Sequence, residues 1–207
     1  MSRTSDPNDI PERLIKSGLS LFLNQGYNGT GIKQITDHAG VPKGSFYNHF
    51  TSKEAFAAVI VDYYAENSAE AWQHMMASAP HDPMAAIRHV FECMLDHHQR
   101  ASSPAGCLIG NFAAEIALSS ECCRLSLIAA QQAWRDRLAN LIEQAQQAGS
   151  VRTDVDAQTL SGTTWSVWEG ALLRMKIERS TQPVQQSIAL ILDRLYPPPT
   201  QHARGFK

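Results

Sequence analysis

The segment TGIKQITDHAGVPKGSFYNHFTSKEAF, residues 30–56, constrains the fold more than any other part of the chain. Its apolar residues recur at the three- and four-residue spacings of a helix on both sides of Gly40-Val41-Pro42, where glycine and proline interrupt helical structure. We expect Thr30 to cap the first of two short helices, and KGSFYNH to form the second. The residues expected to pack against the preceding helix are Ile32, Ile35, Ala39, Val41, Phe46 and Phe50.

Helical periodicity continues along the rest of the chain, and no stretch shows the alternation of a strand. The predicted fold class is all-α, with about nine helices. Asp9 and Glu12 have the spacing of a capping box for a first helix over 10–25. Later helices are expected at 53–76, 84–100, 106–118, 121–148, 155–178 and 182–195. This organisation predicts a three-helix domain over 1–55, a helical body over 56–199 and a disordered tail over 200–207.

Composition and charge limit the classes of protein that the chain can represent. With 43% hydrophobic and 18% charged residues it has an ordinary globular composition. No apolar run approaches the roughly 20 residues that span a bilayer, and residues 1–14 lack an apolar signal segment, so we expect a cytoplasmic protein without a membrane partner. The four cysteines show no zinc-ligand or CxxC spacing and should be free thiols. We expect neither a cofactor nor a metal.

The second short helix combines groups that suit the major groove of DNA. Lys43, Gly44, Tyr47 and Asn48 face away from Phe46, and such lysine, hydroxyl and amide groups can meet phosphates and base edges. The net charge of −2 is unevenly distributed, because residues 1–60 carry six basic and five acidic side chains while 61–207 carry twelve and fifteen. The slight excess of positive charge therefore lies at the end that would contact DNA.

Residues 30–53 resemble the helix-turn-helix of the TetR family of transcriptional repressors, T-x-I-x-x-I-x-x-x-A-G-V-x-x-G-x-x-Y-x-H-F-x-x-K, without a gap. The resemblance implies double-stranded operator DNA as partner. Positions that usually contact phosphates are matched by Thr30, Tyr47, His49 and Lys53. The front of the recognition helix is matched by Lys43, Gly44 and Ser45, with Gln34 approaching the groove from the preceding helix. The alternative for Tyr47 and His49 is that they only pack the three-helix domain.

The same resemblance implies a homodimer that reads a palindromic operator, because one short recognition helix binds weakly. In the family the last two long helices form the dimer interface, which corresponds here to 155–178 and 182–195. The apolar residues expected at the interface are Trp165, Leu172, Ile188, Leu192 and Leu195, with Trp168 and Leu173 as further apolar anchors on the same helices. The alternative is that some of these side chains only fill the core of one subunit.

The family places an effector pocket among the middle helices, and ligand and operator favour different conformations. Residues 106–118 are mostly apolar, and Cys107, Asn111 and Glu115 form one polar line at i, i+4 and i+8. This line is either a pocket wall or the single solvent-exposed strip of the helix. Cys107 is either a packed core residue or a thiol made reactive by its place in a first helical turn and by a cation such as Lys176.

Two short pieces, PAGCLIGNFAAE and ALLRMKIERS, resemble repressors of this family that respond to electrophiles and small unsaturated compounds such as N-ethylmaleimide or acrylate. The predicted function is a repressor released by a small effector sensed near Cys107; the alternatives are a non-covalent hydrophobic ligand, a ligand-binding or scaffold protein without DNA recognition, and a thiol-dependent enzyme. The residues assigned to the effector site are Cys107, Asn111, Glu115, Trp134, Trp168 and Lys176.

Overall fold

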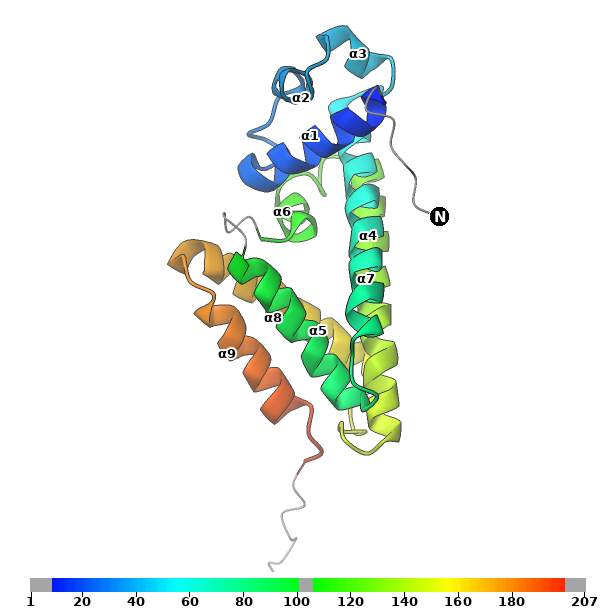
Figure 1. Ribbon diagram of the computed structural model, residues 1–207, viewed down its shortest axis with the longest axis vertical. Coiled ribbons are helices and arrows are strands. Elements are labelled where there is room, and N and C mark those ends of the chain that lie inside the picture. The colour runs from blue at the N-terminus through cyan, green and yellow to red at the C-terminus, as the bar shows by residue number, and fades with distance from the viewer. Residues whose placement is uncertain (1–8, 101–105, 200–207) are drawn as a thin grey trace, which may run out of the picture. The chain divides into compact units, whose positions relative to one another are not determined.

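The computed structural model describes residues 9–100 and 106–199, so the expected tail at 200–207 lies outside the described residues. These two ranges contain helices and turns and no strand, as the periodicity predicts (Figure 1). The helices are α1 Ile10–Gln25, α2 Ile32–Ala39, α3 Lys43–Tyr47, α4 Lys53–Ala77, α5 Pro83–Arg100, α6 Leu108–Glu115, α7 Glu121–Gln147, α8 Ala157–Glu178 and α9 Gln182–Leu190, followed by a π-helical turn, Ile191–Leu195.

The chain divides into two compact units. Unit 1 consists of the described residues of 1–70 and 105–132, and unit 2 of those of 71–104 and 133–207. Unit 1 therefore contains α6 and the start of α7 together with the three N-terminal helices, whereas the sequence suggested a boundary after residue 55. No helix within the described residues has the length and hydropathy needed to cross a membrane.

Helix starts follow the capping residues that the sequence offers. The carboxylate of Asp9 accepts a hydrogen bond from the N–H of Glu12 at 3.4 Å, and α1 has the expected bounds. The hydroxyl of Ser52 accepts from the N–H of Ala55 at 3.1 Å at the start of α4, and Asp156 caps α8 through the N–H of Thr159 at 2.8 Å. These contacts satisfy amide groups that a helix leaves without intrahelical partners. The starts of α1 and α4 agree with the prediction, whereas α8 starts at Ala157 and not at the expected residue 155.

The turn between α2 and α3 depends on Gly40. This residue has φ 65° and ψ 38°, in the left-handed region, and its N–H donates to Asp37 O while the N–H of Val41 donates to Thr36 O. From α1, the guanidinium of Arg13 donates to the carbonyls of Ala39 at 2.5 Å and Gly40 at 3.1 Å. Carbonyl groups at the C-terminal end of α2 are thus satisfied by the turn itself and by Arg13 of α1. The next helix, α3, starts at Lys43, three residues after Gly40.

Thr30 does not cap α2, contrary to the sequence-based prediction. The residue at the N-cap is Gly31, whose N–H donates to the side-chain oxygen of Gln34 at 2.7 Å. The hydroxyl of Thr30 instead points back and donates to the carbonyl of Gly26 at 2.8 Å. Because Gln34 satisfies the exposed amide end of α2, the buried threonine is available to hold the α1–α2 turn.

An aromatic cluster forms the core of unit 1. Phe56 of α4 lies 5.1 Å from Phe46 and 4.6 Å from Phe50, measured between ring centroids, and Phe22 of α1 packs edge-on against Phe112 of α6 at 5.2 Å. In Figure 1, α2 and α3 lie on one side of α1 and α6 lies on the other. Five of the six residues expected to be buried in this domain are buried, Ile35, Ala39, Val41, Phe46 and Phe50, and Ile32 is half-buried.

Unit 2 has its own aromatic core. Trp134 lies 4.9 Å from Trp165 and 6.4 Å from Phe91, and Phe91 lies 5.8 Å from Trp168. After α9 the backbone hydrogen bonds change to the five-residue spacing of a π-helix. The N–H of Tyr196 donates to Ile191 O at 2.9 Å.

Two helix ends differ from the expected ones. α6 stops at Glu115 rather than at residue 118, because the backbone of Ile116 leaves the helical region while the apolar run continues to the fully exposed Leu118. The regular α-helix of the last segment stops at Leu190, and the π-helical turn that follows carries Tyr196 into the core, where its hydroxyl meets that of Thr164 at 2.8 Å. Apolar patterning does not distinguish either kind of ending.

Candidate DNA interface and effector site

The outer face of α3 is polar, and its inner face is anchored by one ring. Lys43, Gly44 and Tyr47 are exposed, Ser45 is half-buried and Phe46 is buried. Gly44 would have no heavy atom within 4 Å of an added Cβ, so the backbone here is open to close approach. Among the described residues no carboxylate pairs with Lys43. This face can accept a phosphate backbone and a base edge without first breaking internal contacts.

Tyr47 and His49 combine a packed ring with a solvent-exposed polar end. The ring of Tyr47 is edge-on to Phe46 at 5.4 Å, yet the residue is 55% exposed. The ring of His49 lies 6.4 Å from Phe50, and this residue is also exposed. Each ring is therefore held by the domain core while its donor atoms remain available, so packing and DNA contact are compatible roles for both residues.

The other residues assigned to phosphate contact are engaged within unit 1. Thr30 is 1% exposed and donates to Gly26 O. The ammonium of Lys53 donates to the carbonyl of Tyr27 at 2.7 Å and lies 4.0 Å from the centroid of the same ring. Burial lowers the pKa of Lys53 from its usual value, and burial raises the pKa of Tyr27 to about 12. Thr30 and Lys53 thus stabilise the turn between α1 and α2. The remaining residue assigned to DNA contact, Gln34, is exposed at the start of α2.

The polar line of α6 has different surroundings at its two ends. Cys107 is the N-cap residue of the helix and is 9% exposed, and the hydroxyl of Tyr64 donates to its Sγ at 3.9 Å. Asn111 is half-buried. Glu115 accepts a hydrogen bond from the N–H of Asn28 at 2.7 Å, so its carboxylate lies at the α1–α2 turn. Glu115 is half-buried, and the hydrogen bond gives it a contact that neither alternative includes.

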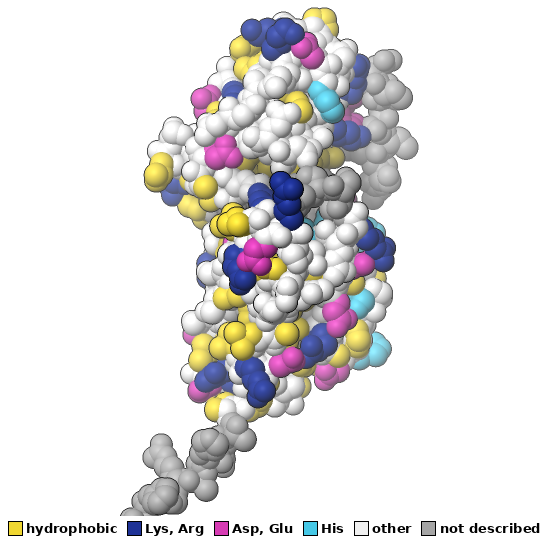
Figure 2. Space-filling view, turned by 90° about the vertical axis from the view of Figure 1, so that its left-hand side faces the viewer, with side chains coloured by type: hydrophobic (Ala, Val, Ile, Leu, Met, Phe, Trp, Pro, Cys, Tyr) yellow, Lys and Arg dark blue, Asp and Glu magenta, His cyan; other side chains and the backbone are white. Residues whose placement is uncertain are grey.

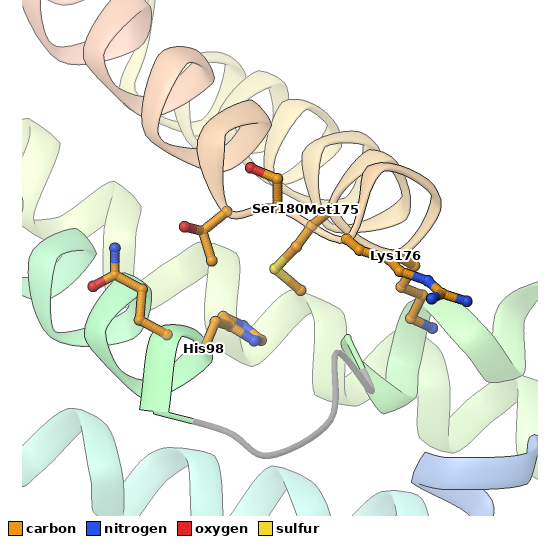
Figure 3. Close-up of a pocket in the computed structure, with 7 residues that line it drawn as sticks. His98, Met175, Lys176 and Ser180 are labelled. Atoms are coloured by element: carbon orange, nitrogen blue, oxygen red, sulfur yellow. The ribbon is translucent and has the colours of Figure 1, made fainter.

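Unit 2 contains a cavity of about 610 Å³ (Figure 3). Figure 3 shows His98 and Met175 near its centre, with Lys176 and Ser180 on the segment at the end of α8. Burial lowers the pKa of His98, whose ring lies 5.8 Å from Trp168. The lining residues are His98, Gln99, Met175, Lys176, Arg179, Ser180 and Thr181, which include two cations and no carboxylate. A cavity with this lining favours a ligand that carries a negative charge or hydrogen-bond acceptors.

Sequence reasoning found part of this cavity. Lys176 was assigned to the effector site and lines the cavity, and Trp168 supports it through His98. Arg179 and Ser180 were missed as lining residues although both belong to the quoted piece ALLRMKIERS. Trp134 packs in the core of unit 2. Cys107, Asn111 and Glu115 belong to unit 1, so the structure divides the assigned effector residues between the two units.

The residues assigned to the dimer interface are mostly covered by their own chain. Trp165, Leu172, Ile188 and Leu192 are buried and Leu195 is half-buried. Other apolar side chains on α8 and α9 are exposed, namely Val167, Leu173, Ile177 and Leu190. Figure 2 shows one face of the molecule, on which hydrophobic side chains lie among charged ones. Of these four exposed residues, Leu173 is among the apolar anchors expected from the sequence, and Val167, Ile177 and Leu190 are not.

The thiols and histidines of the described residues are the side chains that a metal site would use. Cys93, Cys107, Cys122 and Cys123 are not joined in disulfides. Burial, together with the negative charges of Cys122 and Asp62, raises the pKa of Cys123 to about 12. Over the described ranges, no group of three or more histidine, cysteine or acidic side chains is placed to hold a metal ion.

An exposed helix-turn-helix in one unit, followed by a second helical unit, is typical of a DNA-binding transcription regulator. Residues 14–60 match the family described as bacterial regulatory proteins, tetR family, and residues 83–191 match the tetracyclin repressor-like C-terminal domain. The chain belongs to the tetR family and is a transcriptional regulator, not an enzyme. Proteins of this family bind operator DNA and small-molecule effectors and are dimeric.

Individual relatives agree over nearly the whole chain. The chain is 32% identical to the HTH-type transcriptional repressor DhaR of Mycobacterium sp. (strain GP1), over 91% of this chain and 93% of DhaR. The crystal structure of regulatory protein TetR from Rhodobacter sphaeroides matches with a TM-score of 0.81 and 30% identity, over 88% of this chain and 96% of that one. The reduced form of E. coli NemR matches with a TM-score of 0.80 and 26% identity, over 89% and 95%.

Proposed function

We propose that this regulator is a repressor that binds a palindromic operator as a homodimer and releases it when a small electrophilic or unsaturated effector reaches the region of Cys107. The observation that carries the DNA-binding part is the exposed face of α3, where Lys43, Gly44 and Tyr47 lie free of internal ion pairs among the described residues. Ser45 within α3 and His49 just after it are further candidates for DNA contact, as is Gln34, which is exposed in the first turn of α2. Because the partner is chromosomal DNA, the same proposal places the protein in the cytoplasm.

The DNA-binding part is tested by fluorescence anisotropy with duplexes from the region upstream of the protein's own gene and its neighbours. We expect a complex whose affinity falls steeply with salt, because phosphate contacts release counterions. Lys43→Ala should weaken it and reduce the salt slope by about 1.8, because one phosphate contact of about 0.9 is lost from each subunit of the proposed dimer. Arg194→Ala, which removes an exposed positive charge from unit 2, serves as the matched control. If the wild-type protein binds none of these duplexes at low salt, the proposal is wrong.

The surroundings of Cys107 support a reactive role for its thiol. Its Sγ lies at the N-terminal end of α6 and accepts a hydrogen bond from Tyr64, and both the helix end and a hydroxyl donor favour negative charge on sulfur. Cys122 is more exposed but lies beside Cys123, whose thiol stays protonated at neutral pH. Support for the second candidate, a reversible ligand, comes from the cavity that Lys176 and His98 line and Trp168 borders.

Intact-protein mass spectrometry after mild treatment with N-ethylmaleimide, run beside operator release, separates the two effector candidates. Under the covalent candidate, wild type and Cys122→Ser release DNA with one added mass at Cys107, and Cys107→Ser does not respond. Equal release by wild type and Cys107→Ser excludes covalent sensing. In that case Lys176→Met, which removes the cation from the cavity and keeps most of its volume, is the variant expected to lose the response.

A further inference from the structure

The carboxylate of Glu115 meets a part of the DNA-binding domain that is 87 residues away in sequence. Glu115 is the last residue of α6, and its Oε2 accepts the N–H of Asn28 at 2.7 Å, in the turn between α1 and α2. A carboxylate at the C-terminal end of a helix faces the negative end of the helix dipole, so this position weakens α6 itself. The contact across to the turn gives the carboxylate a role that helix stability does not.

The α1–α2 turn is shaped around this carboxylate. Gly26 has φ 76° and ψ 173°, and a Cβ added there would lie 2.4 Å from Oε1 of Glu115. The carboxylate therefore occupies the space that a side chain at residue 26 would need. On the same turn the ammonium of Lys53 binds the carbonyl of Tyr27. Burial lowers the pKa of Lys53, and the negative charges of Glu54 and, to a smaller extent, Glu115 oppose this effect. An acid from α6 and a base from α4 thus bind consecutive parts of one turn.

An aromatic contact fixes the helix that carries Glu115. Phe112, three residues earlier on α6, lies edge-on to Phe22 at 5.2 Å and to Tyr27 at 5.9 Å. Phe112 and Phe22 are fully buried. Because these rings hold α6 against the end of α1, the carboxylate is presented to the turn at a defined position.

The turn in turn determines where α2 and α3 lie. The hydroxyl of Thr30 donates to the carbonyl of Gly26, and α2 begins two residues later. The Gly40 turn then joins α2 to α3. We propose that Glu115 is a positioning residue for operator binding: by accepting the N–H of Asn28 it holds the α1–α2 turn in the geometry that presents α3 to DNA, without touching DNA itself. This inference rests on the proposed function of operator binding.

The test compares Glu115→Ala, Glu115→Gln and Glu115→Asp in the full chain. Glutamine keeps an acceptor oxygen at the same reach, whereas aspartate keeps the charge but is one methylene too short. We expect operator affinity to fall on the order of tenfold for Ala and Asp, within the usual range of coupling between sites, and to stay within about threefold of wild type for Gln. The salt slope should be unchanged in all three, because no phosphate contact is removed. Glu121→Ala, which removes an exposed carboxylate of the same unit paired only locally with Arg124, is the control.

Hydrogen exchange at the amide of Asn28 supplies a readout that does not require DNA. Its protection should be lost in Glu115→Ala and Glu115→Asp and kept in Glu115→Gln, while the urea midpoint of unit 1 identifies any general loss of stability. The inference is overturned if Glu115→Ala binds operator as wild type does, if Glu115→Asp matches Glu115→Gln, or if affinity follows the folded fraction alone. If the wild-type protein binds no operator, the proposed function is wrong. If the Asn28 amide is nevertheless protected in wild type and Glu115→Gln and not in the other two variants, the contact between Glu115 and Asn28 is still confirmed.

Discussion

The ammonium of Lys53 lies 4.0 Å from the centroid of the Tyr27 ring and donates a hydrogen bond of 2.7 Å to the carbonyl of the same residue. Two different interactions of one side chain therefore hold the end of the α1–α2 turn. A cation over a ring and a charge-assisted hydrogen bond each contribute about 1 to 2 kcal/mol when partly desolvated. The resemblance to known repressors assigned Lys53 to phosphate contact, and the structure adds this internal role.

Replacing Lys53 by methionine should lower the free energy of unfolding by about 1 to 3 kcal/mol, because the ring and the carbonyl both lose their cation. Urea unfolding followed by tyrosine fluorescence and circular dichroism measures the change. Lys16→Met is the control, since Lys16 is a surface residue paired with Glu12 and such pairs contribute at most about 1 kcal/mol. Equal losses for the two variants would contradict the role given to Lys53.

Two glycines of the helix-turn-helix should respond oppositely to alanine. Gly40→Ala forces a side chain into the left-handed region, at φ 65° and 3.1 Å from the guanidinium of Arg13, and should destabilise unit 1 by about 1 to 2 kcal/mol. Gly44→Ala has free space and a helical backbone, so stability should rise by up to about 1 kcal/mol. Its methyl group would keep α3 away from the phosphates, and operator affinity should fall on the order of tenfold.

Urea midpoints and operator titrations of both glycine variants check this pair of predictions. A Gly44→Ala protein that binds operator as tightly as wild type would show that the backbone of α3 does not approach DNA closely. A Gly40→Ala protein of unchanged stability would show that the turn has an alternative geometry.

The buried hydrogen bond between Thr164 and Tyr196 predicts an asymmetry between two substitutions. The hydroxyl of Thr164 donates to Leu160 O at 2.8 Å, so the Tyr196 hydroxyl, 2.8 Å away, is the donor of the pair. Tyr196→Phe leaves no donor unsatisfied and should cost about 1 kcal/mol, whereas Thr164→Val leaves a buried hydroxyl without an acceptor and should cost about 1 to 3 kcal/mol. Calorimetric or urea unfolding of both variants measures the difference, and a larger cost for Tyr196→Phe would reverse the donor assignment.

Local signals predicted local structure, while contacts distant in sequence escaped prediction. The bounds of α1 and the turn at Gly40 follow from neighbouring caps and backbone preferences, so they could be read from the chain. The contact of Glu115 with Asn28 joins segments 87 residues apart, and no spacing rule indicates it. The direction of the Thr30 hydroxyl was also not predicted. The side chain of Gln34 accepts the N–H of Gly31 at the start of α2, and the hydroxyl of Thr30 donates to the carbonyl of Gly26 instead.

The last two helices show why apolar residue types alone do not separate the core of the subunit from its surface. Along α8 the apolar residues occur on all sides, so the sequence does not show which of them face the core of unit 2. Trp165 and Leu172 are buried, and Leu173 and Ile177, one helical turn apart, are exposed. Leucine and isoleucine therefore occur both in the core of the subunit and on its surface, and residue type does not separate the two.

Alkaline pH should destabilise unit 1 through Cys123. Burial raises the pKa of this thiol to about 12, above the ordinary value near 9. A pKa raised by folding means that the stabilisation is fully present below the unfolded value and is lost as the pH rises toward the folded one, so the urea midpoint should fall between pH 9 and 12. Cys123→Ala should reduce this slope more than Cys122→Ser does, because burial is the largest cause of the raised pKa and the charge of Cys122 is a smaller one. The slope should not vanish in Cys123→Ala, because Tyr27 also has its pKa raised to about 12.

Ile177→Glu should convert the proposed dimer into monomers. Ile177 is 81% exposed on α8, so the substitution should leave the fold of the subunit intact, while a carboxylate without a partner in an apolar helix interface opposes association. Sedimentation velocity at micromolar concentration measures the change, and operator affinity should fall with it because two heads must bind together. Leu125→Glu is the matched control, since Leu125 is an exposed leucine of α7 in unit 1. If Ile177→Glu stays dimeric while Leu125→Glu dissociates, the interface lies on α7 and not on α8.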